Sequence, residues 1–443
     1  MRLIIVSRAL VVAVCCVAMG AGCSNQGVAP PLQAVSPAVR QHRGTGGNWN
    51  ANTLFEFNGP NGENGPNAII RDEQGNLYGT TPKGGDTSPS DCNFDQTSPG
   101  CGVVFKLSQQ SSGWKQTLLH TFTGPPDGEA PFYAALARDT AGNLYGTTIS
   151  GGLLNPSNCA IFWGQRNLGC GTVFKVHPNG KYRIIYKFKG EPDGYGPYGV
   201  IEDGHGNLYG TTQYGGTYNE GTVFKINSRG KETVLYSFQG GADGAAPITT
   251  VVSDAAGDLF GTTQPPPYTC YNYGSCGTVF ELDTHRHLTV LYTFTLTASG
   301  DGPNQVIRDP SSGTLYGTAW NGGTYYRLGS IWKVTKAGAF TELYAFTGYS
   351  DGKRPYGAVM LDRQGNLYGT ASSGGAYNAG TVWKLNKRGK FSVLYAFLNG
   401  SSSLTNPAAN LVRDPSGDLY GPAEYGGACS ACGGIFELMP GTH

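Results

Sequence analysis

An aspartate recurs seven times at the same place in a repeated motif of this sequence. Seven such carboxylates could ligate Ca²⁺ or act as general acids and bases, but a site used once does not need seven copies. In most copies a glycine follows three residues later, and an Asp-to-Gly spacing of this kind is typical of a tight turn. We therefore predict turns at Asp72, Asp139, Asp203, Asp254, Asp309, Asp362 and Asp414.

A second set of carboxylates lies in Asp-Gly pairs, most of which are followed shortly by a proline. A ring of carboxylates near a central opening could bind a cation, but the spacing lacks the alternating oxygen ligands of a calcium loop. We predict turns here as well, and neither a metal site nor a cofactor. The aspartates are Asp127, Asp193, Asp243, Asp301 and Asp351.

Eight of the eleven cysteines form four local pairs that occupy equivalent places in the repeat. An even count in an exported protein indicates disulfides. Cys429-Ser-Ala-Cys432 could instead be a redox or metal site, but a redox motif opens a helix and structural zinc needs four ligands. The predicted bridges are Cys92–Cys101, Cys159–Cys170, Cys270–Cys276 and Cys429–Cys432.

Aromatic side chains are frequent in the segments that connect the repeated motifs. Tyrosine and tryptophan present flat apolar faces with a polar edge, which suits sugar rings or a peptide. Alternatively, these rings pack between neighbouring units or fix their own loops. The candidate ligand-binding residues are Tyr214, Trp320, Tyr325, Tyr326, Arg327, Tyr377 and Tyr425.

The elements that position these residues come from a repeat of the stretch GNLYGTT. Its copies begin at Gly75, Gly142, Gly206, Gly257, Gly313, Gly365 and Gly417. The third copy shows four short segments rich in β-branched and aromatic residues, at residues 197–203, 207–212, 221–226 and 233–238. A period near 50 residues with four strands per unit is typical of a β-propeller blade.

The two ends of the repeat region predict a closed ring. Residues 54–57 (LFEF) match the fourth strand of a unit, whereas residues 435–438 (IFEL) match a third strand. If the first segment completes the last blade, no unpaired edge remains between the chain ends. We therefore predict an all-β, seven-bladed β-propeller over residues 53–443, with four antiparallel strands per blade and the N-terminal strand completing the last blade.

The N-terminal segment is typical of an export signal. A basic start and a short apolar run precede Gly20-Ala21-Gly22-Cys23, which resembles the lipobox of bacterial lipoproteins. That resemblance implies a signal peptide over residues 1–22, a lipid on Cys23 and, from Ser24, the outer membrane. The alternative is an ordinary secretory signal cut near Ala21. Residues 23–52, rich in proline and glycine, are expected to form a flexible tether.

The whole unit, LYxFxG…DG…P…D…GNLYGTT…GG…GTVFKL…G over residues 53–438, resembles the choice-of-anchor tandem repeat GloVer-containing proteins. The resemblance implies export and attachment to the cell surface, for which an N-terminal lipid is one means. It carries over no reaction and no catalytic residues.

The expected function is a binding or scaffold module in the cell envelope, as an outer-membrane lipoprotein or at the cell surface, with a polysaccharide or a cell-surface protein as partner. A net charge of +1 gives no reason to expect nucleic acid. No catalytic residue is assigned, since the sequence lacks G-x-S-x-G, H-E-x-x-H and phosphate-loop motifs. The alternatives are a hydrolase, lyase or lactonase acting on sugars, and a purely structural envelope protein. If the residues at the channel mouth differ between blades, they would indicate a binding site. If the same residues repeat in every blade, they would indicate a scaffold.

Overall fold

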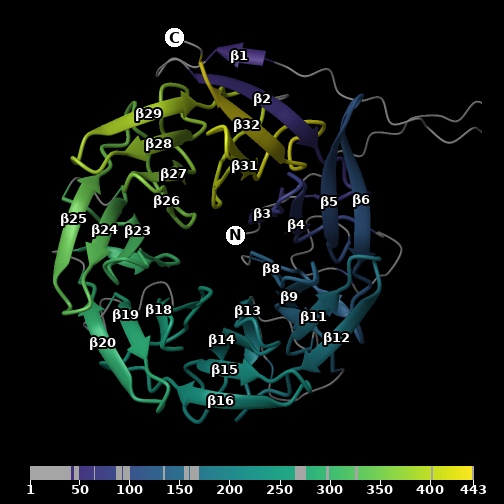
Figure 1. Cartoon of the computed structure of the whole chain (residues 1–443), viewed down its shortest axis with the longest axis vertical. Helices are drawn as coiled ribbons and strands as arrows, with labels where there is room; N and C mark the ends of the chain where they lie inside the picture. The colour runs from purple at the N-terminus through teal and green to yellow at the C-terminus, as the bar shows by residue number, and fades with distance from the viewer. Residues whose placement is uncertain are drawn as a thin grey trace, which may run out of the picture. The chain divides into compact units, whose positions relative to one another are not determined.

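The computed structural model describes residues 41–43, 49–63, 65–85, 92, 100–132, 135–153, 159, 169–264, 276–295, 299–324, 328–400 and 403–441. In this part of the chain the regular elements are strands, which form seven antiparallel sheets arranged in a circle (Figure 1). The predicted seven-bladed β-propeller is thereby confirmed. Among the same residues, no helix has the length and apolar character needed to cross a membrane.

Each blade runs from a short inner strand to an outer strand. In that order, the first blade has β3 (Ile69–Arg71), β4 (Leu77–Thr81), β5 (Val103–Gln110) and β6 (Gly113–Thr121); the second has β8 (Ala137–Arg138), β9 (Leu144–Thr148), β11 (Thr172–Val176) and β12 (Tyr182–Lys187); and the third has β13 (Tyr195–Glu202), β14 (Leu208–Tyr214), β15 (Thr222–Ile226) and β16 (Glu232–Ser237). The fourth blade has β17 (Val252–Ser253), β18 (Leu259–Thr263), β19 (Thr278–Leu282) and β20 (Leu288–Thr293), and the fifth has β22 (Ile307–Arg308), β23 (Leu315–Asn321), β24 (Ser330–Val334) and β25 (Phe340–Ala345). The sixth blade has β26 (Met360–Leu361), β27 (Leu367–Ala371), β28 (Thr381–Leu385) and β29 (Phe391–Ala396), and the seventh has β30 (Val412–Arg413), β31 (Leu419–Ala423), β32 (Gly434–Pro440) and β2 (Trp49–Glu56). Four further short strands join these sheets or pair with each other: β1 (Gln41–Arg43) pairs with β2, β21 (Asp301–Pro303) pairs with β23, and β7 (Gly128–Glu129) pairs with β10 (Ser150–Gly151).

The N-terminal strand closes the ring as predicted. Strand β2 pairs antiparallel with β32 and places Phe55 opposite Ile435. The strand begins at Trp49, ahead of the boundary expected at residue 53, and β1 lies farther ahead still. Trp49 packs against the apolar cluster between the sixth and seventh blades, so this part of the expected tether is part of the sheet.

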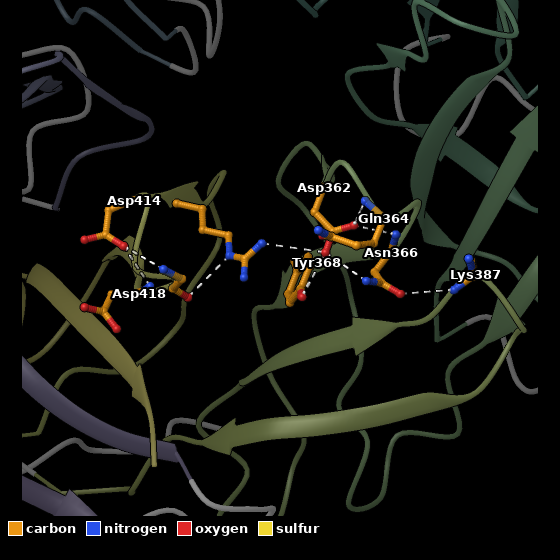
Figure 2. A network of polar contacts seen from close by, with 9 residues as sticks. Asp362, Gln364, Asn366, Tyr368, Lys387, Asp414 and Asp418 are labelled. Carbon is orange, nitrogen blue, oxygen red and sulfur yellow. Dashed lines mark hydrogen bonds and ion pairs between the residues drawn. The ribbon is translucent and has the colours of Figure 1, made fainter. Parts of the chain in front are cut away.

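The recurrent aspartates build the corner between the first and second strands, and this prediction is confirmed. In the sixth blade Oδ1 of Asp362 accepts hydrogen bonds from the backbone N–H groups of Gln364 and Asn366, at 2.9 and 2.8 Å. Its Oδ2 accepts hydrogen bonds from Nδ2 of Asn366 at 2.8 Å and from the hydroxyl of Tyr368 at 3.2 Å (Figure 2). The asparagine and the tyrosine of GNLYG thus both donate hydrogen bonds to the same carboxylate, which accounts for their presence in the motif.

The second glycine of the motif lies beneath an aromatic ring of the adjacent strand. A Cβ on Gly369 would lie 2.4 Å from Cζ2 of Trp383, and one on Gly210 would lie 2.7 Å from Cζ of Phe224. No side chain fits at such distances, so the close approach of the ring requires glycine at this position.

Aromatic rings join each blade to the next around the whole circle. A phenylalanine that follows the outer strand of one blade meets, edge to face, the ring on the third strand of the following blade. All these rings are buried, and their centroids are 5.0 to 6.0 Å apart. The pairs are Phe57–Phe105, Phe122–Phe174, Phe188–Phe224, Phe238–Phe280, Phe294–Trp332, Phe346–Trp383 and Phe397–Phe436.

Candidate functional site

A cavity of about 440 Å³ lies in the centre of the propeller, because every blade contributes to its lining. Most of the lining is apolar or carries amides and hydroxyls, and no Asp or Glu occurs among the described residues that line it. Residues from the successive blades include Asn67, Ala135, Tyr198, Thr249, Asn304, Tyr356 and Asn410.

Two repeat positions meet where this channel opens. The first directly follows the GTT, GTA or GPA stretch of the second strand, and the second directly precedes the proline between blades. Backbone hydrogen bonds join the two positions, as from Ser372 N to Arg354 O at 3.1 Å. In blade order the first position holds Pro82, Ile149, Gln213, Gln264, Trp320, Ser372 and Glu424, and the second holds Gly65, Ala130, Gly196, Ala246, Gly302, Arg354 and Asn406.

A second cavity of about 180 Å³ lies at these positions in the fifth, sixth and seventh blades. It shares Asn67, Tyr356 and Ala408 with the channel, so the two cavities adjoin. We call this cavity the mouth pocket. Its lining is Pro66, Asn67, Trp320, Arg354, Tyr356, Ser372, Asn406, Ala408, Ala409 and Glu424.

Trp320 is held in place by its neighbours in the fifth and sixth blades. A Cβ on Gly302 would lie 2.1 Å from Cδ1 of Trp320, so the indole lies directly against the bare Cα of this glycine. Its ring meets that of Tyr356 at a centroid distance of 6.2 Å and an interplanar angle of 69°. The half-buried indole therefore forms one wall of the mouth pocket together with Tyr356.

Arg354 occupies a backbone conformation that disfavours most side chains. Its φ is +56°, a left-handed value that costs a non-glycine residue about 1–3 kcal/mol. Five of the six equivalent positions in other blades hold the small residues Gly or Ala, and Arg354 is exposed. Within the described part of the chain the guanidinium forms no ion pair, and the contacts of Arg354 are made by its backbone: the carbonyl accepts hydrogen bonds from N and Oγ of Ser372.

Glu424 is a half-buried carboxylate that also lines the mouth pocket. Its Oε2 accepts a hydrogen bond from the amide of Asn406. Burial is the largest influence on the pKa of Glu424 and raises it; a hydrogen bond with Tyr425 and the positive charge of Lys83 oppose this shift without cancelling it.

Asn67 stands at the junction of the channel and the mouth pocket. Its Nδ2 is buried and has no hydrogen-bond partner among the described residues. A buried donor without a partner is uncommon in folded proteins. An oxygen of a bound molecule would satisfy it.

The predicted ligand-binding residues divide between exposed and packed positions. Trp320 lines the mouth pocket, and Tyr377 and Tyr425 are exposed, 40% and 38% of each residue being accessible. Tyr214 instead stacks on Tyr195 at a centroid distance of 5.1 Å, so it packs within its own blade. The other three predicted residues, Tyr325, Tyr326 and Arg327, lie outside the described residues.

Arg354 and Glu424 were not predicted as site residues from the sequence. The signal that could have found them is their difference from the equivalent residues of the other blades. It becomes visible only when the repeat is aligned beyond the conserved GNLYGTT stretch.

Three of the four predicted disulfides are present: Cys92–Cys101, Cys159–Cys170 and Cys429–Cys432. Cys276 is also disulfide-bonded, but its predicted partner Cys270 lies outside the described residues, as does Cys23. In the part of the chain that is described, no three His, Cys, Asp or Glu side chains gather in a way that could hold a metal ion.

Comparison with known proteins gives one family and a set of similar folds. A model of the Gloeobacter/Verrucomicrobia repeat matches residues 42–264, 159–326 and 268–443, and no curated protein matches the chain. The extracellular domain of a putative hybrid two-component system from B. thetaiotaomicron is 13% identical with a TM-score of 0.50, and the match covers 87% of this chain and 40% of that one. A second such domain from the same organism is 10% identical with a TM-score of 0.51, covering 91% and 42%. The chain spans about two fifths of the length of these proteins, and at such identities the likeness shows the fold alone.

Proposed function

This chain belongs to the Gloeobacter/Verrucomicrobia repeat family, and we propose that it is an exported module that binds a glycan in the mouth pocket of its propeller. One observation carries the proposal: the residues at the mouth differ from blade to blade, whereas the framework beneath them repeats. A purely structural ring has no need of Trp320, Arg354 and Glu424 in single copies around one small cavity.

The chemistry of the lining suits a sugar. The rings of Trp320 and Tyr356 offer apolar faces on which the C–H face of a pyranose stacks. Amide, hydroxyl and carboxylate groups of Asn67, Asn406 and Glu424 stand nearby to exchange hydrogen bonds with sugar hydroxyls. An apolar wall combined with a few convergent polar groups is the usual composition of a small-molecule site.

Hydrolysis of a sugar receives less support from the same lining. Glycoside hydrolases require a pair of carboxyl groups about 5–10 Å apart on either side of the scissile bond. Among the described residues that line the channel and the mouth pocket, Glu424 is the one carboxylate. A binding module is therefore the better account of the pocket.

Export and anchoring are part of the proposal. The disulfides support a destination outside the reducing cytosol, and the basic and apolar start of the chain supports a signal peptide. A lipid on Cys23 would attach the propeller to the cell envelope. Mass spectrometry of the protein recovered from membranes tests this step, since an unmodified N-terminus near Ala21 would contradict it.

A glycan array probed with the folded chain from residue 24 onward tests the binding itself. We expect Trp320→Ala to weaken binding about tenfold or more, because a stacking aromatic contributes more than about 1 kcal/mol. Tyr349→Ala is the matched control, since Tyr349 is 77% exposed and lies outside the mouth pocket. Equal loss in both variants, or binding that neither variant changes, would refute the assignment of the pocket.

A further inference from the structure

We propose that the mouth pocket selects an acidic glycan and that the guanidinium of Arg354 binds its carboxylate. The inference rests on the proposed function, because it names the class of glycan that the same pocket takes.

The charges around the pocket leave one cation without a counterion. Of the described lining residues, Arg354 and Glu424 are the ones that carry a formal charge. The carboxylate of Glu424 accepts a hydrogen bond from Asn406 and lies within the electrostatic influence of the buried Lys83, whose positive charge offsets it. The guanidinium of Arg354 is exposed and forms no ion pair within the described residues, so an anion is the complementary ligand.

The geometry favours a carboxylate attached to a sugar ring. Guanidinium binds a carboxylate through two parallel N–H···O hydrogen bonds, which a lysine cannot reproduce. Arg354 lies one residue before Pro355 and two before Tyr356, whose ring meets Trp320. A pyranose stacked on these rings would present its ring substituents at its edge, and Arg354 is the cation among the described residues that line the same pocket. The unpartnered Nδ2 of Asn67 offers a second donor to the same ligand.

The fold itself does not require an arginine at this position. The equivalent Ala130 and Ala246 adopt the same left-handed conformation with φ of 51° and 47°, and the remaining equivalents are glycines and Asn406. The hydrogen bonds that Arg354 makes to the described residues come from its backbone. Its side chain is therefore available to a ligand, and its removal is compatible with the blade.

An array on which each acidic glycan is printed beside its carboxyl-reduced, neutral counterpart tests the proposal. We expect the wild-type chain to prefer the acidic member of a pair by about tenfold or more, as a charge-assisted bidentate contact provides. Arg354→Ala should bring the two members within about twofold of each other, and Arg354→Lys should restore only part of the preference. Arg388→Ala is the control, since Arg388 is an exposed arginine in the turn between β28 and β29.

The outcomes separate the two claims. Equal binding of the acidic and the neutral member, or an acidic preference that survives Arg354→Ala, overturns the role of Arg354 and leaves a glycan-binding pocket. Absence of binding to every glycan overturns the proposed function and this inference together. Thermal unfolding of each variant shows whether a loss of binding comes from a loss of fold.

Discussion

At the scale of single residues, the aspartates at several blade corners link local structure to pH. Burial raises the pKa of Asp362, but hydrogen bonds from the side chain and backbone of Asn366 outweigh it and hold the pKa below its usual value. At Asp72 and Asp139 hydrogen bonds from the following asparagine likewise outweigh burial, so the pKa of each carboxyl lies below its usual value. A carboxylate whose pKa is lower in the folded state stabilises the fold above its unfolded-state pKa, and this stability is lost as pH falls through the lower folded value.

Urea unfolding measured between about pH 6 and pH 2 tests this relation. We expect the midpoint to fall below about pH 4, where unfolded aspartates take up protons before folded ones do. Asp362→Asn should lower the midpoint at neutral pH and reduce the loss on acidification. A midpoint independent of pH in this window would contradict the account.

Arg354 gives a second prediction at the same scale, since its left-handed backbone is strained. The Arg354→Gly variant should have a free energy of unfolding about 1 kcal/mol higher than that of the Arg354→Ala variant. Glycine has no Cβ and therefore adopts a positive φ without a steric clash. Equilibrium unfolding of the two variants measures the difference. A glycine variant less stable than the alanine variant would show that the left-handed backbone at residue 354 does not lower the stability of the fold.

Residue-level features could be predicted from the sequence where a pattern repeats, and could not be predicted where they depend on burial and on strand register. The turns at the aspartates and the cysteine pairs follow from local chemistry that is visible in the chain. Tyr214 was chosen as an exposed ring, but its stacking on Tyr195 depends on the register of β13 against β14. Arg354 and Glu424 face one pocket only because different blades meet at the channel.

At the scale of elements, aromatic contacts connect each sheet to the next. Each blade is a small sheet that cannot bury both faces alone, and the edge-to-face rings join its outer strand to the next blade. The sequence shows the phenylalanines of the LYxF and GTVF segments but does not show which blade each ring reaches. The structure shows which blade each ring contacts; the Phe57–Phe105 pair, for example, joins the seventh blade to the first.

Phe238→Leu tests the contribution of one such contact. Phe238 is fully buried and meets Phe280 of the next blade at 5.3 Å, so we expect a loss of about 1–3 kcal/mol in the free energy of unfolding. Tyr218→Leu, at a ring that is 54% exposed, should change it by less than about 0.5 kcal/mol. Chemical denaturation of both variants gives the comparison, and similar values would contradict the role of the contact.

At the scale of the whole molecule, strand β2 is the element that closes the circle. Its pairing with β32 could be predicted because residues 54–57 match a fourth strand that has no blade of its own. The earlier start at Trp49 was not predicted, because three of the five residues in NWNAN are asparagines, which are depleted in strands, and the pairing with β32 holds this segment in the sheet.

Removal of residues 1–57 should open the ring and expose the edge of β32. We expect this truncated chain to aggregate or to lose its cooperative unfolding transition, because an unpaired strand edge invites association. Removal of residues 1–40 keeps β1 and β2 and serves as the control. Size-exclusion chromatography and thermal unfolding compare the two, and a monomeric, cooperatively folded product of the longer deletion would contradict the closure.

The central claim is that a ligand sits against Trp320 in the mouth pocket, and ¹⁹F NMR of the chain labelled with 5-fluorotryptophan tests it most directly. Trp320→Phe identifies the resonance, and the fully buried Trp332 and Trp383 provide internal references. On titration with a glycan that the array selects, we predict that the Trp320 resonance shifts while these two references stay in place. Saturating binding that leaves the Trp320 resonance unmoved would contradict the claim.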